Sequence, residues 1–311
     1  MSEFHHISVL LEECLEGLAI KPDGIYLDGT LGGAGHSSQI AKRLTTGRLI
    51  GIDRDPVALK AAGERLEPYN DRVTLVHSNF CEMAQVVKDL GLPGVDGILL
   101  DLGVSSPQLD DGARGFSYMA DAPLDMRMNS EDSLTAHTVV NTWSQEELKR
   151  ILFDYGEERY APRIASAICR YREEKPIDTT LELVDIIRSA MPAQALREKQ
   201  HPAKRSFQAI RIAVNDELGS VERAMEAAIP LLNPGGRLAV ITFHSLEDRI
   251  VKNAMAEAAK GCTCPPNFPV CVCGKKPLVK IISRKPIVAT EEELEVNPRS
   301  RSAKLRVCEK I

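Results

Sequence analysis

The alternation of short apolar runs with helical segments in the first hundred residues places the strongest constraint on the fold of this 311-residue chain. Strands are expected at 25–28, 49–53, 73–76 and 98–101, with helices at 37–44 and 56–66. Strands that alternate with helices in this way are typical of a parallel sheet covered by helices on both faces. The pattern therefore predicts an α/β, Rossmann-like fold with a mostly parallel, doubly wound sheet.

A glycine-rich loop at 29–35 follows the first expected strand and precedes a helix. Glycines let the backbone turn tightly and approach a ligand closely. Asp53 ends the next expected strand, about 20 residues after Gly32, a spacing typical of a carboxylate that binds ribose hydroxyls at the edge of a sheet. Loop and acid together favour a ligand that contains adenosine, against the alternative of a structural turn beside a surface aspartate.

Two residues that flank this loop distinguish between adenosine ligands. Asp28 ends the strand before the loop, and His36 stands at the start of the helix after it. The glycine spacing also departs from the G-x-G-x-x-G pattern of NAD sites, and no P-loop motif is present. A carboxylate at Asp28 would repel a phosphate but suits an ammonium group. The segment therefore favours S-adenosylmethionine as the ligand.

Asp101 ends the fourth expected strand, and the loop that follows it is rich in small and polar residues. Ligands of open parallel sheets lie beyond the carboxyl ends of the strands. Asp101 is therefore predicted to be the catalytic residue beside the methyl donor, the alternative being a buried structural acid. None of the 18 prolines is followed by cysteine, which disfavours carbon-5 methylation of pyrimidines. Transfer to an amine needs hydrogen-bond acceptors and in-line positioning rather than a covalent intermediate.

Helical patterns replace the strand pattern between about 106 and 207, at 144–155, 162–173 and 181–190. Strands return at 237–243, 278–282 and 305–307, after a helix at 220–232 and a turn at 234–236. We therefore predict a sheet domain formed by residues 1–106 and 208–311. Residues 107–207 are expected to form an inserted, all-helical subdomain that recognises the substrate.

The net charge of −5 does not by itself indicate a nucleic-acid binder. Basic residues are concentrated at 197–211 and again at 275–306, so a basic binding face and an ordinary solvated surface are both open. The sequence has no run of about 18 apolar residues, and its acidic start is unlike a signal or transit peptide. A cytoplasmic protein without membrane contact is expected.

Long blocks spread over nearly the whole chain resemble the bacterial 16S ribosomal RNA cytosine-N4 methyltransferase family. They are HISVLL (6–11), DGT (28–30), GHS (35–37), IDRDP (52–56), DLGVSSPQLD (101–110), RGFS (114–117), PLDMRM (123–128), YGEER (155–159), FQAIR (207–211), FHSLEDR (243–249) and NPRSRS (297–302). Ordered blocks of this length are far more specific than a glycine loop.

The resemblance implies a class I methyltransferase sheet with a helical insert. It also implies methylation, with S-adenosylmethionine, of the N4 amine of a cytidine in the decoding region of the small-subunit RNA. The donor contacts that it implies are Ala34, Gly35, His36, Asp53, Phe80, Asp101 and Gln108. Phe80 and Gln108 rest on the resemblance alone. The amino-methyltransferase signature [DN]-P-P-[YFW] is absent, since Leu102 and Gly103 follow Asp101. Arg211 and His244 are candidates for contact with RNA, with structural roles as the alternative.

Four cysteines near the carboxyl end form a C-x-C-x6-C-x-C pattern, at positions 262, 264, 271 and 273. Four thiolates can bind a structural zinc ion, and in a reducing cytosol metal binding is commoner than disulfide formation. The C-x-C spacing is less usual for zinc than C-x2-C, and the expected chemistry needs no metal. The sequence therefore favours a reduced, metal-free loop, and no metal ligand is predicted.

Three other functions share parts of this pattern. An NAD-dependent oxidoreductase has the same sheet and the same acid after the second strand, but Asp28 and the glycine spacing argue against it. A non-catalytic RNA-binding module or a methyltransferase of DNA amines would share the fold, and only the family resemblance argues against them. The expected partner is 16S ribosomal RNA or the small ribosomal subunit. No protein partner is implied, and a homodimer is left open.

Overall fold

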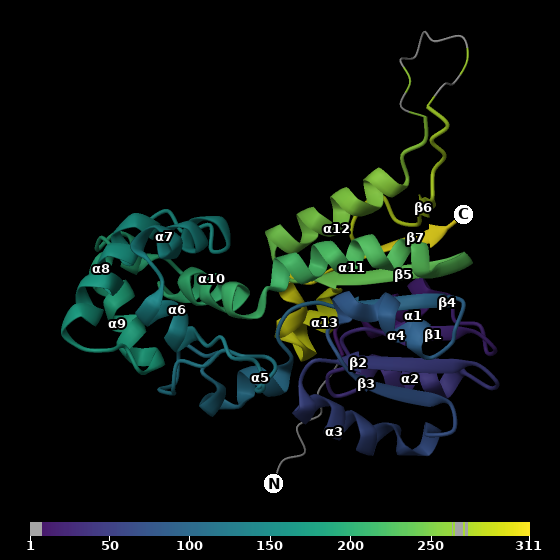
Figure 1. The fold of residues 1–311 in the computed structure, drawn as a ribbon, viewed down its shortest axis with the longest axis horizontal. Coiled ribbons are helices and arrows are strands. Elements are labelled where there is room, and N and C mark those ends of the chain that lie inside the picture. Colours follow the sequence, from purple (N-terminus) through teal and green to yellow (C-terminus); the bar gives the residue numbers. More distant parts are fainter. Residues whose placement is uncertain (1–7, 263, 265–269, 271–272) are drawn as a thin grey trace. The chain divides into compact units, whose positions relative to one another are not determined.

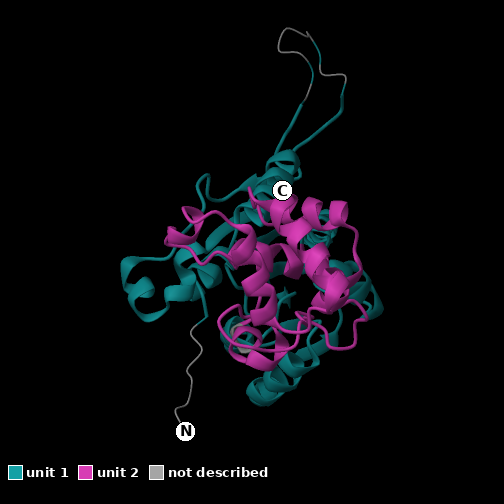
Figure 2. Cartoon of the chain, turned by 90° about the vertical axis from the view of Figure 1, so that its left-hand side faces the viewer, with its two compact units in different colours: residues 1–103, 218–311 teal, residues 104–217 magenta. Residues whose placement is uncertain are grey.

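The computed structural model describes residues 8–262, 264, 270 and 273–311 (Figure 1). The chain divides into two compact units, coloured separately in Figure 2. Unit 1 contains residues 1–103 and 218–311, and unit 2 contains residues 104–217. The sequence pattern placed the boundaries after 106 and 207. Helix α10, Lys204–Asn215, runs through the second of these positions, so the helical unit extends about ten residues further along the chain.

Unit 1 is built on a seven-stranded sheet. Its strands are β1 Ile25–Asp28, β2 Arg48–Asp53, β3 Val73–His77, β4 Val95–Asp101, β5 Leu232–Thr242, β6 Val279–Ile281 and β7 Lys304–Lys310. They lie in the order β3-β2-β1-β4-β5-β7-β6. The first five are parallel, whereas β7 runs antiparallel to both β5 and β6. This arrangement confirms the α/β, Rossmann-like class I fold.

The helices of unit 1 are α1 Leu11–Leu18, α2 Gly35–Arg43, α3 Pro56–Leu66, α4 Met83–Asp89, α11 Glu217–Leu231, α12 Ser245–Ala258 and α13 Glu291–Val296, with short 3-10 turns at η1 Glu67–Tyr69, η2 Phe80–Glu82 and η5 Pro298–Ser302. The turn expected at 234–236 lies within β5. It appears there as an irregularity, because the β4–β5 register shifts between Val95 and Gly97.

Both faces of the sheet are buried, as expected for parallel strands with helical crossovers. Alternate strand residues point to opposite faces. Tyr26 packs in a cluster with residues of α1, α2 and α3, whereas its neighbour Leu27 packs with residues of α4, α11 and α12. Leu99 and Leu100 of β4 divide in the same way. This alternation explains why the strands are nearly continuous apolar runs in the sequence.

Unit 2 is helical: α5 Ser106–Asp110, η3 Gly112–Arg114, α6 Ala136–Thr142, α7 Gln145–Asp154, α8 Ala161–Glu174, α9 Thr180–Ala190, η4 Ala195–Arg197 and α10. Among its described residues there is no extended strand, and the apolar faces of α6 to α10 form one core. Two helices begin with capping boxes, Ser144 with Glu147 in α7 and Thr179 with Glu182 in α9. Each box satisfies otherwise unpaired amides at a helix start.

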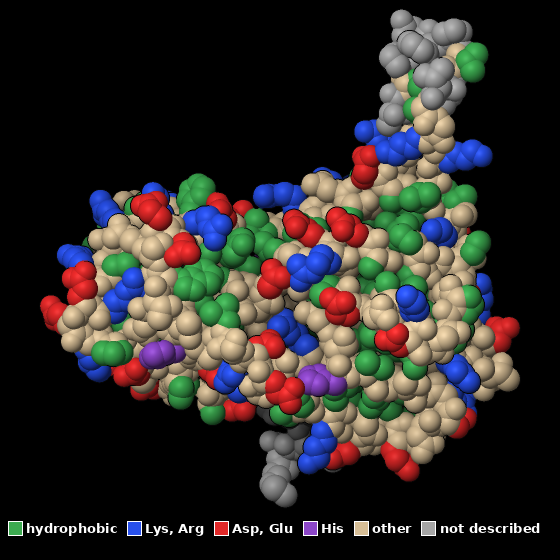
Figure 3. Space-filling model, in the orientation of Figure 1, with side chains coloured by type: hydrophobic (Ala, Val, Ile, Leu, Met, Phe, Trp, Pro, Cys, Tyr) green, Lys and Arg blue, Asp and Glu red, His purple; other side chains and the backbone are tan. Residues whose placement is uncertain are grey.

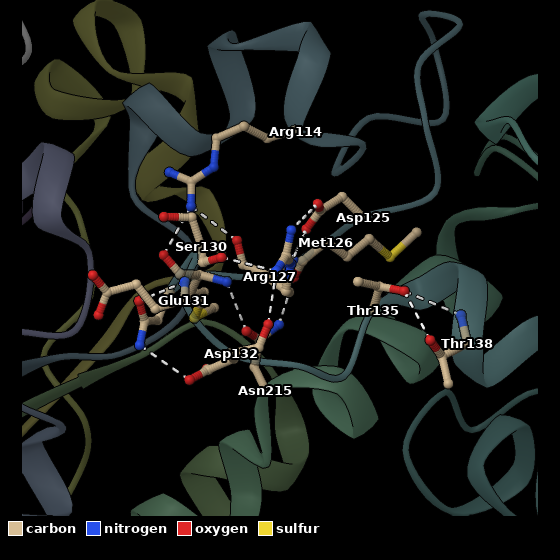
Figure 4. Close-up of polar contacts among 12 residues, drawn as sticks. Arg114, Asp125, Met126, Arg127, Ser130, Glu131, Asp132, Thr135, Thr138 and Asn215 are labelled. Atoms are coloured by element: carbon tan, nitrogen blue, oxygen red, sulfur yellow. Dashed lines mark hydrogen bonds and ion pairs between the residues drawn. The ribbon is translucent and has the colours of Figure 1, made fainter.

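The PLDMRM segment at 123–128 is held by a network of polar contacts in unit 2 (Figure 4). Arg127 makes two bonds to Asp125, from Nε to Oδ1 at 2.9 Å and from Nη2 to Oδ2 at 2.7 Å. Arg114 Nη2 donates to the carbonyl oxygens of Arg127 and Met128, each at 2.8 Å. Asn215 of α10 bonds the same segment from the other side. These contacts give an otherwise irregular segment one conformation.

In the part of the chain that the structure describes, no helix is long and apolar enough to cross a lipid bilayer.

Candidate active site at the carboxyl edge of the sheet

Three aspartates end three adjacent strands of the unit 1 sheet. Asp28 ends β1, Asp53 ends β2 and Asp101 ends β4. Asp28 pairs with Gly51 of β2 and with Leu99 of β4, so Asp53 and Asp101 stand two residues beyond it on either side. The strand order reverses between β1 and β4. Open α/β sheets bind ligands at this switch point, beyond the carboxyl ends of the strands.

The loop after β1 is attached through its backbone to both neighbouring strands. The amide of Gly29 donates to the carbonyl of Leu99 in β4 at 3.0 Å, and the amide of Leu31 donates to a carbonyl of β2 at 3.1 Å. Gly32 has a φ of 49° and donates its amide to Asp53 Oδ2 at 2.7 Å. Glycine adopts this left-handed conformation without strain, so the loop can direct its amide to the carboxylate.

Gly29 must lack a side chain, because a Cβ there would lie 2.6 Å from Leu100 Cδ2 and 3.0 Å from Phe80 Cβ. We expect Gly29→Ala to lower the free energy of unfolding by roughly 1–3 kcal/mol, because an overpacked core forces its neighbours to move. Urea denaturation measures the change. Gly33→Ala is the matched control, since a Cβ at Gly33 meets nothing within 4 Å. Equal losses in the two variants would contradict the expectation.

Asp28 is buried, with 2% of its surface exposed. Its Oδ1 accepts a bond from the Thr30 amide at 3.1 Å, and its Oδ2 accepts one from Ser37 Oγ at 2.7 Å. The pKa of Asp28 is raised to about 6, chiefly by burial and also by the nearby Asp53 carboxylate, whereas the two hydrogen bonds oppose the shift. Asp28 therefore joins the loop to α2 through these two bonds. At a pH above its pKa it also adds a negative charge to this edge of the sheet.

Asp53 is held by backbone amides. Besides the bond from Gly32, its Oδ1 accepts a bond from the Asp55 amide at 2.9 Å. Burial raises its pKa, with the hydrogen bonds acting in the opposite direction. A carboxylate has about four acceptor positions, so the bonds from these amides and from the Arg54 amide still leave acceptor capacity for a ligand hydroxyl. The side chain is only half-buried, and its position is fixed before a ligand binds.

Asp101 is the least satisfied of the three carboxylates. Its Oδ1 is buried and has no hydrogen-bond partner among the described residues. Its Oδ2 lies 3.9 Å from His36 Nδ1, too far for a hydrogen bond. The pKa of Asp101 is raised to about 8, chiefly by burial and also by the charges of Asp28 and Glu247. A ligand group that donates a hydrogen bond to Asp101 Oδ1 would satisfy this buried acceptor.

The charges of these aspartates act on one another. Asp53 raises the pKa of Asp28, and Asp28 raises the pKa of Asp101. A cationic ligand at this edge would relieve the repulsion, whereas a phosphate would increase it. This edge of the sheet therefore suits a positively charged ligand that donates hydrogen bonds.

Comparison with known proteins gives the family of the chain. The model of the MraW methylase family matches residues 3–311. The chain belongs to the MraW methylase family. The match confirms the resemblance carried by the sequence blocks, and membership of a methylase family argues against the oxidoreductase alternative.

Relatives of this MraW methylase cover its whole length. A protein from Brevibacillus brevis named ribosomal RNA small subunit methyltransferase H is 60% identical over 309 residues, 99% of this chain and 98% of the relative. A protein of the same name from Heliobacterium mobile is 61% identical over 311 residues, 99% of this chain and 100% of the relative. The crystal structure of an rRNA methylase from Streptococcus thermophilus matches 98% of this chain and 99% of its own, with a TM-score of 0.44 and 11% identity.

The predicted residues after β1 lie at the start of α2 in this methylase. Ala34 precedes the helix with a φ of 56° and is fully buried, and Gly35 is the first helical residue. The ring of His36 is also buried, and its Nε2 lies 2.9 Å from the carbonyl oxygen of Val9. The buried side chains of Ala34 and His36 hold the helix start in place, so contacts to a ligand from these residues would be made mainly by the backbone.

Phe80 and Gln108, which rested on the resemblance alone, lie in different units. Phe80 opens η2 just after β3 and is half-buried beside Gly29, at the same edge as the aspartates. Gln108 lies in α5 of unit 2, where its Oε1 accepts a bond from the Ser105 amide at 3.0 Å. The fold of unit 1 thus brings six of the seven residues that were predicted to contact the methyl donor to one edge of the sheet.

The two candidates for RNA contact already have protein partners. Arg211 makes a two-bond ion pair with Glu217, with both nitrogen–oxygen distances at 2.8 Å and little exposure of either side chain. His244 caps α12 through its Nδ1, which accepts a bond from the Glu247 amide, whereas its buried Nε2 lies 3.1 Å from Glu247 Oε1 without a hydrogen bond among the described residues. These contacts favour the structural alternative for both residues.

Sequence reasoning missed two residues that shape the site. Thr30 Oγ1 accepts a bond from the Asp101 amide at 2.6 Å, which joins the glycine loop to the end of β4. Ser37 bonds the buried carboxylate of Asp28. Both residues lie in blocks that carry the family resemblance, DGT at 28–30 and GHS at 35–37, and those blocks are the signal in the sequence that could have identified them.

Proposed function

We propose that this chain transfers a methyl group from S-adenosylmethionine to the N4 amine of a cytidine in the decoding region of small-subunit ribosomal RNA. The observation that carries the proposal is the acidic edge formed by Asp28, Asp53 and Asp101, where one buried oxygen of Asp101 lacks a hydrogen-bond donor among the described residues. The names of the relatives from Brevibacillus brevis and Heliobacterium mobile support the choice of substrate.

The residues at the edge fit S-adenosylmethionine. The ligand carries a sulfonium and an ammonium group, which the aspartates would attract. Asp53 would accept bonds from the ribose hydroxyls and Phe80 would lie beside the adenine. Ala34, Gly35 and His36 would line the loop, and Asp101 would lie near the methionine end. The contact expected from Gln108 of unit 2 rests on the family resemblance alone. When bound, S-adenosylmethionine would supply an electrophilic methyl group.

Asp101 would act on the cytosine amine. The amine is a weak nucleophile because its lone pair is delocalised into the ring, and a hydrogen bond to a carboxylate would orient the lone pair toward the methyl group. Bond formation from the amine to the methyl carbon would break the bond from that carbon to sulfur, whose electron pair would remain on sulfur, and would leave an extra proton on the nitrogen. As a carboxylate, Asp101 can accept this proton, so the proposed activity requires its deprotonated form.

The helical insert would recognise the RNA. A paired or stacked base must leave its stack before the amine can be reached. Exposed cations at the start of α10 and just before it (Arg197, Lys199 and Lys204) are available for phosphate contacts. On this proposal the protein acts in the cytoplasm, where its RNA is found. The homodimer remains a proposal that no step of the reaction requires.

We expect Asp53→Ala to lower kcat/KM for methyl transfer roughly 30- to 1000-fold, because lost hydrogen bonds to a charged acceptor cost about 2–4 kcal/mol. The measurement is transfer of labelled methyl from S-adenosylmethionine to small subunits that lack the modification, with the nucleoside identified by mass spectrometry. The control is Asp71→Ala, an exposed aspartate just before β3, at the opposite edge of the sheet. Label in a nucleoside other than N4-methylcytidine would refute the proposed target, and no label at all would refute the proposed reaction.

A further inference from the structure

Three cysteines near the carboxyl end of the chain lie together outside the candidate active site. Cys262, Cys264 and Cys273 form this cysteine cluster, and their sulfur atoms all lie within 4.8 Å of one another. The sulfur atoms of Cys262 and Cys273 are 3.6 Å apart, and the amide of Cys264 lies 3.4 Å from the sulfur of Cys262. Cys271, the remaining cysteine of the sequence pattern, lies outside the described residues.

The sulfur spacing fits a metal better than a disulfide. A zinc ion binds thiolates at about 2.3 Å in tetrahedral geometry, which places the sulfur atoms about 3.8 Å apart. A disulfide requires about 2.05 Å. The 3.6 Å between Cys262 and Cys273 is therefore close to the edge of a tetrahedral thiolate site. An amide aimed at a cysteine sulfur, as from Cys264, stabilises the thiolate form that a metal needs.

Contacts outside the cluster bring its two chain segments together. Glu257 near the end of α12 forms an ion pair with Lys275, and the carbonyl of Ala258 accepts a bond from the Leu278 amide at 2.8 Å. Figures 1 and 2 both show the chain leaving α12 and returning to β6 side by side. The segments that carry the cysteines are thus joined where they meet the folded unit, which lowers the entropy cost of assembling a shared site.

The local charge suits a site of thiolates. Lys260 precedes the three cysteines in the sequence and Lys275 follows them, and both lysines pair with Glu257. Lys276 is exposed. Figure 3 shows Lys and Arg side chains around the base of this projecting segment. Three thiolates with one zinc ion carry a net charge of −1, which neighbouring ammonium groups stabilise.

The cluster also lies in a part of unit 1 that has little core of its own. The described residues from Lys260 to Leu278 are exposed or half-buried, whereas the flanking Met255 and Val279 are buried. Val279 of β6 pairs with Lys310 at the end of β7. The neighbouring Glu309 pairs with Arg237, near the start of the part of β5 that is parallel to β4. The cluster is therefore attached at the edge opposite Asp101. A metal there would stabilise the segment and take no part in methyl transfer.

We propose that Cys262, Cys264 and Cys273 bind one zinc ion as a structural site. Binding would form three zinc–sulfur bonds and release the thiol protons to solvent, so affinity should rise with pH. The sequence pattern alone favoured a metal-free loop because of its C-x-C spacing. The placement of the three sulfur atoms is the observation that changes this view.

The test is metal analysis of the full chain purified under reducing conditions, incubated with zinc and freed of excess by gel filtration. We expect about one zinc per chain, and Co²⁺ in its place should give the absorption bands of tetrahedral thiolate coordination. The double variant Cys262→Ser/Cys273→Ser should retain less than roughly a tenth of an equivalent, since two of the three proposed zinc ligands are removed. Cys169→Ser, a half-buried cysteine of unit 2, is the matched control and should bind zinc like the native chain.

Zinc below a tenth of an equivalent in the native chain would overturn the proposal, and so would equal zinc in the double variant. A Cys262–Cys273 disulfide that persisted under reducing conditions, seen by mass spectrometry of peptides, would also overturn it. None of these readouts depends on methyl transfer, so the zinc site and the proposed activity succeed or fail separately.

Discussion

Replacing Asp101 with asparagine is expected to reduce methyl transfer at least 100-fold and, at pH 8, to make the protein more stable. The loss of activity follows from the loss of a carboxylate that would bond the amine and take its proton; removing one such group typically costs about 10²- to 10⁴-fold. The gain in stability follows from the cost of charging a buried acid. Burial holds the pKa of Asp101 at about 8, against 3.8 for an ordinary aspartate.

The raised pKa of Asp101 determines how the stability of the native chain changes with pH. Between about pH 4 and pH 8 the folded state keeps a proton on Asp101 that the unfolded chain has released, so stability falls as pH rises. At about 1.4 kcal/mol per pKa unit, the raised pKa of Asp101 lowers the free energy of unfolding by roughly 2–5 kcal/mol at pH 8. The lower figure allows for solvent screening, because the side chain is 26% exposed. Asparagine does not titrate. We therefore expect Asp101→Asn to exceed the native chain in stability at pH 8 and to match it more closely near pH 4.

Urea denaturation of both proteins at several pH values measures this difference. Asp28, with a pKa of about 6, contributes a similar slope at lower pH, so the interval from pH 6 to pH 8 reports mainly on Asp101. The control is Asp71→Asn, because Asp71 is exposed and its pKa is lowered by Arg72. That variant should gain no stability and should keep its activity. A native chain whose stability is flat from pH 6 to pH 8 would show that Asp101 is not a costly buried charge.

Asn215→Ala is expected to lower the stability of unit 2 by about 3–5 kcal/mol. The Asn215 side chain is 2% exposed and makes three bonds. Its Oδ1 accepts from the Met128 amide at 2.8 Å, and its Nδ2 donates to the carbonyls of Met126 at 2.7 Å and Arg211 at 2.9 Å. Alanine removes the side-chain partner of the buried Met128 amide and Met126 carbonyl, at about 1–3 kcal/mol each. Met126 adopts a φ of 59°, a conformation that local preference alone does not favour.

Hydrogen exchange of unit 2 amides, together with urea denaturation, measures the loss. Asn129→Ala is the matched control, because Asn129 belongs to the same network through its bond to Asp132 but is half-exposed, with a second bond from the Glu131 amide. That variant should lose less than about 1 kcal/mol. Equal losses from the two substitutions would mean that Asn215 does not hold the PLDMRM segment as its contacts indicate.

Several elements of this fold could be predicted from sequence because their signals are local. The strand before Asp28, the glycine loop and the strand that ends in Asp53 each depend on residues within about ten positions of one another. The helix starts at Ser144 and Thr179 also follow from short capping patterns. The boundary at 207 was placed too early because a helical pattern does not say which core its apolar face joins.

The chain order of residues thus determined the class of fold, the family and the set of acids that end the strands. The folded structure alone decided that Asp28, Asp53 and Asp101 lie side by side, since strand order is not a local property. It also decided that Asp101 is a costly acid, that Arg211 has Glu217 as its partner and that three cysteine sulfur atoms meet. The physical reason is the same in each case. Burial and charge–charge distances depend on contacts between distant segments, and these contacts exist only once the chain has folded.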